Sequence, residues 1–434
     1  DGTSRGLPQG EKRHLARRCQ QIWILGSFRL KKMSMKEWKI IRLGDVVKTN
    51  AKSYSSREGW DFVNYLDTGN ITDNVVEKIQ HIDINKEILP SRARRKVNYN
   101  SILFSSVRPN QRHFGIIKSM PDNFLVSTGF VVVDALTNFV DSDYLYFWLT
   151  QREVVELLHS IAEQSVSAYP SIKSSDIENL EIKLPPIEIQ KRIASILRSI
   201  SEKIQLNNHI NDNLEQQAAA IFRSWFVNCV PFGGIAPDEW KNVTLEDITA
   251  MVSRGITPKY ANDTDQIIIN QKCIRNHMID LSLARNHRPK VINDKWLHFG
   301  DLLINSTGDG TLGRAAPVWF QPHNLTVDSH VTIVRPATEN LIFYIGLWGT
   351  QHEKEIESLH TGSTGQTELP RDRVKAMKLV LPDSKTLAHF NSVMAPMASA
   401  IVTNLEENQR LANLRDALLP KLMSGEIDVS SVKL

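Results

Sequence analysis

The stretch "NLEENQRLANLRDALLPKLMSG", residues 404–425, indicates how the whole chain folds. Leu405, Leu411, Leu418 and Leu422 recur at helical spacing, but Asn404 and Asn408 lie on the same stripe of the helix. A helix buried in an ordinary core would place Leu or Ile at those two positions. The stripe continues in steps of seven, with a second line beside it: Phe390, Met397, Asn404, Leu411, Leu418 and Met394, Ile401, Asn408, Arg415, Leu422. A strict seven-residue step over five layers is typical of a coiled coil.

An earlier segment of the chain repeats this pattern. Its two lines are Ile193, Ile200, Asn207, Leu214, Ile221 and Leu197, Ile204, Asn211, Ala218, Trp225. The asparagines again occupy central layers. If the two helices pack antiparallel, the asparagine amides can bond to one another, whereas a slipped register buries unpaired amides at about 1–3 kcal/mol each.

Parallel pairing would align the same central layers, so the position of the asparagines does not fix the direction of the second helix. A twofold arrangement of two copies favours antiparallel packing, because each helix then returns toward the other domain. The remaining alternative is that two unrelated surface helices both carry asparagine. We expect Asn207 and Asn211 to lie near Asn404 and Asn408 and to set the register of the pair.

The chain repeats one plan at a distance of about 200 residues. "EWK" at 37–39 returns at 239–241, "ILFSSV" at 102–107 returns as "LLINST" at 302–307, and Leu-Pro at 184–185 returns at 381–382. Each copy has strand-like runs, one expected helix such as residues 143–161, and then a long helix that begins near Ile187 or Ser384. The sequence predicts an α+β protein with two similar domains joined by two long antiparallel coiled-coil helices.

These boundaries divide the chain into five parts. Residues 34–184 and 232–381 are the two domains, 185–231 the central helix, and 382–434 the distal helix and tail. Residues 1–33 carry eight Lys or Arg against two acids and lack an initiator Met. We expect a leader or translated upstream segment there, with Met33 or Met35 as the natural start; a basic DNA-binding arm is the alternative.

Composition and motifs exclude several classes of protein. The three cysteines form no CxxC pair, which fits a reducing cytoplasm, and no apolar run is long enough for a membrane span. There is no phosphate loop, no HExxH and no GxSxG elbow. The one GxGxxG, residues 308–313, precedes "RAAPVWF", which has the composition of a strand, so we expect a loop between strands rather than a dinucleotide site. The sequence predicts no catalytic and no metal site.

Two clusters of basic residues indicate nucleic-acid binding, although the net charge of +4 does not. Residues 85–118 contain eight basic residues against one acid, and residues 271–295 contain six against two. The run at 91–96 suits phosphates, because clustered positive charge releases counterions. The residues at 108–113 include Arg, Asn and Gln, which pair with guanine and adenine in the major groove. Each domain therefore has its own basic zone.

These features together resemble the specificity subunits of type I restriction–modification enzymes. The resemblance rests on "EWKIIRLGDV" and "EWKNVTLEDI" at the start of each half, "PSRARRKVNYNSILFSSVRPNQRHFG" in the first half, and "RGITPKYANDTDQIIINQKCIR" with "LLINSTGDGTLGRAAPV" in the second. The segments that lead into the two long helices, which the family uses as spacers, also resemble the family: they are "LPPIEIQKRIASIL" and "HTGSTGQTELPRDRVKAMKLVLP". So do the ends of these helices, "IFRSWF" and "RDALLPKLMSGEIDV". The segment before the second helix departs from the pattern, since Leu381-Pro382-Asp383 lacks the second proline found at Pro186.

The resemblance implies a non-catalytic, cytoplasmic host-defence protein that binds double-stranded DNA and reads a bipartite target, one half-site per domain. It implies two modification subunits that carry S-adenosylmethionine, and restriction subunits that use ATP and magnesium to translocate and cleave. Two alternatives stay open. One is a coiled-coil scaffold or adaptor without a DNA role, and the other is the specificity subunit of a methylation-only system.

The resemblance also implies which residues face DNA. The loop after "ILFSSV" and the corresponding loop after "LLINST" supply the residues Arg108, Asn110, Gln111, Arg112, His113, Thr307, Asp309, Thr311 and Arg314. Phosphate or base contacts are expected from Arg92, Arg94, Arg95, Lys96, Lys259, Arg275 and Arg288.

Overall fold

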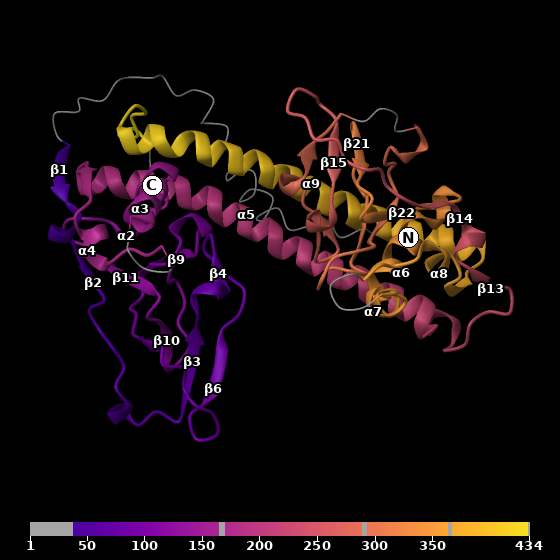
Figure 1. Cartoon of the computed structure of the whole chain (residues 1–434), viewed down its shortest axis with the longest axis horizontal. Helices are drawn as coiled ribbons and strands as arrows, with labels where there is room; N and C mark the ends of the chain where they lie inside the picture. The colour runs from indigo at the N-terminus through magenta and orange to yellow at the C-terminus, as the bar shows by residue number, and fades with distance from the viewer. Residues whose placement is uncertain (1–37, 165–169, 289–292, 363–366, 433–434) are drawn as a thin grey trace, which may run out of the picture. The chain divides into compact units, whose positions relative to one another are not determined.

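The computed structural model describes residues 38–164, 170–288, 293–362 and 367–432. The leader predicted at 1–33 lies outside these residues. They form two compact units, one of residues up to Lys203 together with residues from Leu411 onward, and the other of Ile204–Arg410. Each unit contains a sheet-rich domain and part of both long helices (Figure 1). The predicted α+β class with two similar domains is confirmed.

The first domain is built on two four-stranded sheets. In sheet order, one consists of β2 (Val47–Thr49), β11 (Phe130–Ala135), β8 (Ile102–Ser105) and β9 (Phe114–Ile116), and the other of β6 (Gln80–Asp83), β3 (Phe62–Leu66), β10 (Phe124–Ser127) and β7 (Ala93–Arg95). All four residues of β8 are buried, and β8 pairs antiparallel with β11 and β9. A central strand covered on both faces is nearly all apolar, as "ILFS" is.

Two smaller strand pairs complete the first domain. β1 (Lys39–Arg42) and β12 (Glu181–Leu184) pair antiparallel and join the two ends of the domain. β4 (Ile71–Thr72) and β5 (Val75–Val76) form a hairpin whose turn residues, Asp73 and Asn74, both have positive φ. Such a turn matches the right-handed twist of the strands and favours Asp and Asn.

The helix expected over residues 143–161 is two helices, so this prediction was wrong. α2 (Ser142–Leu149) ends at Thr150, whose hydroxyl donates to the carbonyl of Tyr146 at 2.9 Å, and Gln151 adopts an extended ψ of 143°. α3 (Arg152–Glu163) then starts in a new direction. The break follows from burial, because nearly all of α2 is buried whereas α3 buries one face only. A third, short helix, α4 (Ser174–Glu178), precedes β12.

The second domain repeats the first in element order and pairing, except that its second sheet has no counterpart of β7 among the described residues. Its four-stranded sheet is β14 (Thr249–Arg254), β22 (Val331–Pro336), β19 (Leu302–Asn305) and β20 (Ala315–Pro317), and its second sheet is β18 (Arg285–Asn286), β15 (Ile267–Ile269) and β21 (Leu325–Val327). The remaining elements are β13 (Lys241–Thr244) with β23 (Lys378–Leu381), the hairpin β16 (Ile274–Arg275) and β17 (Met278–Ile279), α6 (Ile342–Gln351), α7 (Glu353–Ser358) and α8 (Arg371–Lys375). The parallel pair β15–β21 corresponds to the parallel pair β3–β10.

The two long helices start at the predicted residues. α5 (Ile187–Phe222) has 36 residues, and α9 (Ser384–Ser424) has 41. Asp383 caps α9, because its carboxylate accepts the backbone N–H of Lys385 at 2.9 Å and of Thr386 at 3.0 Å. Neither of these helices, nor another in the described part of the chain, has the apolar run that crossing a membrane requires.

Within the second unit, α5 and α9 pair antiparallel through the asparagines. Asn404 donates to the side-chain oxygen of Asn211 at 2.8 Å, and Asn207 donates to that of Asn408 at 2.9 Å. The pairing is antiparallel because the residue number rises along α5 as it falls along α9. Asn207 and Asn211 are 0% and 1% exposed, so these amides would be costly without partners. The antiparallel direction predicted from the sequence is confirmed.

Apolar side chains of α5 and α9 also pack together in each unit. In the first unit, Ile193 and Leu197 of α5 share a core with Leu422 and Met423 of α9. In the second unit, the shared core contains Ala218 and Phe222 of α5 with Phe390 and Met394 of α9. Aromatic rings close this end of the helix pair: Phe226 lies 4.8 Å from Phe390 and 4.9 Å from Tyr344 between ring centroids.

The substitution Asn211→Ala tests the asparagine layers. It leaves the half-buried amide of Asn404 without its acceptor, so the free energy of unfolding should fall by about 1–3 kcal/mol in urea denaturation. His209→Ala, at an exposed position of the same helix, is the matched control and should change it by less than about 0.5 kcal/mol. Equal stability of the two variants would show that the amide layers contribute nothing to the pairing.

Candidate nucleic-acid interface

The loop between β8 and β9, residues 106–113, presents polar side chains at the end of a buried strand. We call it the first recognition loop, after the role that the sequence predicts for it. Its backbone is fixed, since Arg108 N–H donates to the carbonyl of Pro170 at 3.1 Å and Ser106 N–H to that of Gly129 at 2.8 Å. Arg108 has φ of 47°, a left-handed conformation that costs a residue with a side chain about 1–3 kcal/mol. Such strain is typical of functional loops.

Three of the five predicted residues of this loop are free to meet a ligand. Arg108, Asn110 and Gln111 are exposed, and their side chains make no hydrogen bond to another residue in the described ranges. Together they offer guanidinium and amide groups, the chemistry that recognises base edges. A short helical turn over Pro109–Gln111 carries two of them.

Arg112 and His113 are already engaged within the protein. Arg112 Nε lies 2.7 Å from Asp73 Oδ1, and its guanidinium lies 5.1 Å from the centroid of the Phe114 ring. His113 Nδ1 lies 2.8 Å from the carbonyl oxygen of Ile71. Both side chains therefore face the β4–β5 hairpin, which the sequence analysis did not identify although Asp73-Asn74 between β-branched residues is a hairpin signal.

The basic run at 92–96 lies on and beside β7, and its members have different environments. Arg92 and Arg94 are exposed. Burial lowers the pKa of Arg95, whose Nε has no hydrogen-bond partner among the described residues. Lys96 pairs with Glu58 and lies 4.9 Å from the centroid of the Trp60 ring.

Arg92 is the member of this run that the structure joins to the recognition loop. Its carbonyl accepts Thr128 N–H at 2.8 Å, and the next residue, Gly129, bonds to Ser106 in the loop. Arg92 and Arg94 therefore offer free positive charge suited to phosphates.

The corresponding loop of the second domain, residues 306–314, is called the second recognition loop. It is built around glycines. Gly308, Gly310 and Gly313 have φ of 107°, 66° and 81°, and β20 follows directly. This arrangement has no helix N-terminus after the glycines, so the GxGxxG belongs to a turn between strands. Just before the loop, the buried amide of Asn305 donates to the carbonyls of Gln271 at 3.0 Å and Thr311 at 3.1 Å.

The four predicted residues of this second loop differ in whether their side chains have hydrogen-bond partners within the protein. Asp309 is exposed. Thr307 Oγ1 lies 2.7 Å from His330 Nδ1, Thr311 Oγ1 donates to the Thr307 carbonyl at 3.4 Å, and Arg314 donates to the Gly310 carbonyl at 2.8 Å. Hydrogen bonds within the protein thus hold three of the four side chains.

The other basic residues predicted in the second domain fall into two places. Arg275 is exposed on the β16–β17 hairpin, and the nearby Gln271 carbonyl is bonded to Asn305, the residue of β19 that precedes the loop. Arg288 N–H donates to the Lys259 carbonyl at 2.8 Å, and the Arg288 side chain pairs with Asp263. The contacts of Lys259 and Arg288 are with each other and Asp263 rather than with the loop.

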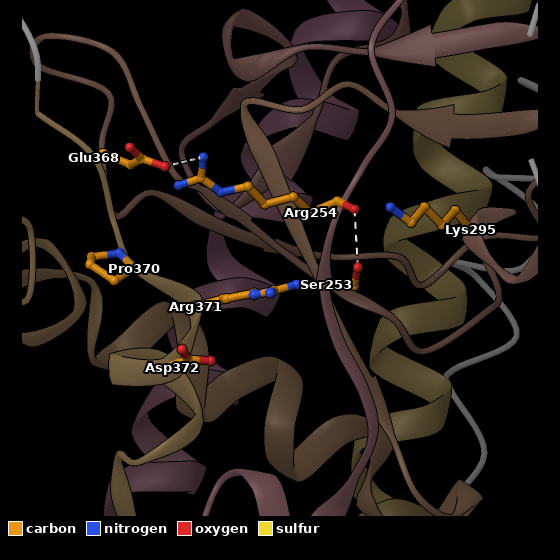
Figure 2. Close-up of a pocket in the computed structure, with 7 residues that line it drawn as sticks. All are labelled: Ser253, Arg254, Lys295, Glu368, Pro370, Arg371 and Asp372. Carbon is orange, nitrogen blue, oxygen red and sulfur yellow. Dashed lines mark hydrogen bonds and ion pairs between the residues drawn. The ribbon is translucent and has the colours of Figure 1, made fainter.

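A cavity of about 320 Å³ adjoins the second recognition loop (Figure 2). Its lining consists of Ser253, Arg254, Lys295, Glu368, Pro370, Arg371 and Asp372. Glu368 joins it to the loop, because Glu368 forms a β-bridge with Thr307 and an ion pair of 2.5 Å with Arg254. Arg371 is exposed without a side-chain bond to another described residue, and it is a phosphate-binding candidate that the sequence analysis missed.

A larger groove of about 760 Å³ lies between the β16–β17 hairpin, α5, α6 and α9 of the second unit. Burial raises the pKa of Glu215 in this groove to about 7. His277 Nε2, at the hairpin turn, lies 3.6 Å from Glu353 Oε2, and this contact raises the pKa of His277. The described residues contain no cluster of His, Cys, Asp and Glu that could hold a metal ion.

Comparisons with known proteins agree with this organisation. The family described as the type I restriction modification DNA specificity domain matches residues 35–216. The chain is 24% identical over 472 residues to the specificity subunit of the type I restriction enzyme HindI from Haemophilus influenzae, covering 91% of this chain and 100% of the relative. It is also 24% identical to the MjaIX specificity subunit from Methanocaldococcus jannaschii, covering 92% and 95%.

A solved structure shares the fold. The S subunit of a type I restriction–modification system from M. genitalium superimposes with a TM-score of 0.56 at 14% identity, covering 91% of this chain and 98% of that structure. Two similar loop-bearing domains and an antiparallel helix pair thus make up the described fold, and the likeness to the solved structure is one of fold. Over residues 35–216 the chain matches the type I restriction modification DNA specificity domain, and over about nine-tenths of its length it is similar to type I restriction enzyme specificity subunits.

The substitution Glu215→Gln tests the pH dependence of the second unit. The pKa of Glu215 is raised from 4.5 to about 7 by burial, so the unfolded chain loses this proton first and stability falls as the pH rises from about 4.5 to about 7. The His277–Glu353 pair is lost as the pH rises through the raised pKa of His277. The melting temperature of the wild type, relative to that of Glu215→Gln, should therefore fall as the pH rises from about 4.5 to about 7. Glu339→Gln, an exposed acid of the same unit, is the control, and an equal fall in all three proteins would contradict the assignment.

Proposed function

We propose that this chain is the non-catalytic DNA-reading subunit of a type I restriction–modification complex and acts in the cytoplasm. Each domain would read one half of a bipartite sequence in double-stranded DNA. The observation that carries the proposal is the duplication of one loop. A polar loop follows β8 in the first domain and β19 in the second, at the same place in the same strand order.

The exposed side chains of these loops suit the proposed division of contacts. Arg108, Asn110 and Gln111 offer groups that pair with guanine and adenine edges. Arg92 and Arg371, which flank the first and second loops, are suited to phosphates because they are exposed and unpaired among the described residues. Base contacts would then specify the sequence and phosphate contacts would orient the domain.

Methylation and cleavage would belong to partner subunits. Two modification subunits would bring S-adenosylmethionine, and restriction subunits would use ATP and magnesium. An exposed apolar pair on α5, Leu206 and Ile210, supports docking on the helices, since these side chains are 51% and 40% exposed. A methylation-only system would need the same docking surface without restriction subunits.

Binding experiments separate this proposal from a scaffold without a DNA role. The chain, assembled with its modification subunits, should bind one duplex at least about a thousandfold more tightly than random duplex, and sequencing of methylated host DNA should give one bipartite motif. Equal, salt-dependent binding to all duplexes would refute sequence reading. Turnover by the chain alone, with magnesium or labelled S-adenosylmethionine, would instead show that it is an enzyme.

The substitution Arg108→Ala should relax sequence choice in one half-site. Removing a bidentate base contact costs about 1–3 kcal/mol of discrimination at one position. The measurement is the dissociation constant for duplexes with each base pair replaced in turn. Asp309→Ala, in the second loop, is the matched variant and should affect only the other half-site. A uniform loss for all duplexes would assign Arg108 to phosphate binding.

Removal of one heptad from each helix should change the spacing between half-sites. Residues 198–204 and 411–417 face each other in the antiparallel register, so their joint deletion preserves the asparagine layers. It shortens each helix by about 10 Å, close to three base pairs of DNA. The methylated motif should keep its two half-sites and lose base pairs between them; altered half-sites with the old spacing would contradict the role of the helices.

A further inference from the structure

The β4–β5 hairpin of the first domain is joined to the second half of the recognition loop by a reciprocal pair of contacts. Arg112 Nε lies 2.7 Å from Asp73 Oδ1, and Asp73 N–H donates to the Arg112 carbonyl at 3.0 Å. The same two residues are thus connected by side chain and by backbone. An exposed ion pair is weak by itself, but the backbone bond fixes its two ends together.

The neighbouring residues extend this contact along the hairpin. Asn74 N–H donates to the Phe114 carbonyl at 2.9 Å, and Asn74 Oδ1 accepts Ile116 N–H at 2.8 Å. Gly115 allows the close approach, because a Cβ there would lie 2.5 Å from Ile71 Cδ1 and 2.8 Å from Asn74 Oδ1. The hairpin therefore lies directly against the strand that leaves the loop.

Three of the contact residues have a left-handed backbone conformation. Arg112, Asp73 and Asn74 have φ of 61°, 48° and 67°. Arginine has no local side-chain bond that would favour this region, unlike Asp or Asn, so its conformation must be held by its surroundings. The Phe114 ring under the guanidinium and the carboxylate of Asp73 provide that hold.

A carboxylate next to a DNA-reading loop also needs an explanation, because it repels phosphate. Asp73 is 47% exposed, and its partner Arg112 belongs to the basic zone of residues 85–118. In the other domain the connection is indirect: the hairpin turn residue His277 lies 3.6 Å from Glu353 of α7, and Glu353 accepts Ala315 N–H at 2.6 Å. Ala315 directly follows the second recognition loop, so α7 connects the hairpin turn to the end of that loop.

We propose that Asp73 and Arg112 are positioning residues that hold the first recognition loop in its reading shape, and that Arg108, Asn110 and Gln111 contact the bases. This inference rests on the proposed DNA-reading function and revises the role of Arg112 within it. Arg112 acts on sequence choice through the loop, and Asp73, whose carboxylate is repelled by phosphate, is as necessary as Arg112.

The test uses Asp73→Asn, Arg112→Gln and the double variant in the complex assembled with modification subunits. Dissociation constants are measured for the preferred duplex, for duplexes with each base pair replaced, and for random duplex over a salt series. Each single variant should lose about tenfold of discrimination across several positions of one half-site, and the double variant should lose no more than either single one. Random-duplex affinity and the other half-site should stay unchanged.

The matched control is a second exposed ion pair of the first domain, Arg152 Nε and Glu156 Oε1 at 2.7 Å on α3. Arg152→Gln should leave discrimination intact, and equal melting temperatures exclude a folding defect. Loss at one base pair in Arg112→Gln with full discrimination in Asp73→Asn would overturn the inference and make Arg112 a base reader. A salt dependence reduced by about one phosphate in Arg112→Gln would also overturn it. A wild-type complex without sequence preference would instead refute the proposed function itself.

Discussion

The pairing of four asparagine amides between α5 and α9 is the constraint on which both units depend. Asn207 and Asn211 are buried, and each bonds to an asparagine of the other helix. Apolar layers alone would tolerate a slip by one heptad, whereas a slip here leaves amides buried without partners. In the same unit Phe222 and Phe390 share one core, so the polar and the apolar contacts of that unit agree on one register. In the first unit, Ile193 and Leu422 share the core.

The two domains keep the same frame and differ where sequence reading is proposed. Buried strands β8 and β19 have equivalent neighbours, and each ends in a loop held by a backbone bond from the segment that precedes α4 or α8. The first loop uses a short helical turn with strained arginines, and the second uses three glycines at positive φ. A rigid sheet that tolerates different loops allows sequence choice to change without loss of the core.

Charge acts locally in this molecule. The basic residues grouped by the sequence do not form one uniform surface, because Lys96, Arg112 and Arg288 each have an acidic partner. Arg112 is held by Asp73, while Arg108 is exposed and has no side-chain partner among the described residues. Whether a basic side chain has an acidic partner therefore matters as much for DNA binding as the number of basic residues. For this reason a net charge of +4 says little about function.

The sequence by itself determined the duplication, the α+β class, the start of both long helices and the central asparagines, because heptad spacing and repeated motifs are local patterns. It misjudged residues 143–161, where Thr150 and Gln151 break the helix to satisfy the burial of α2. Tertiary structure alone showed that Asp73 meets Arg112 and that Arg371 lies beside the second loop. Those residues are 39 and 57 or more positions from their partners in the chain, and only the folded sheets bring them together.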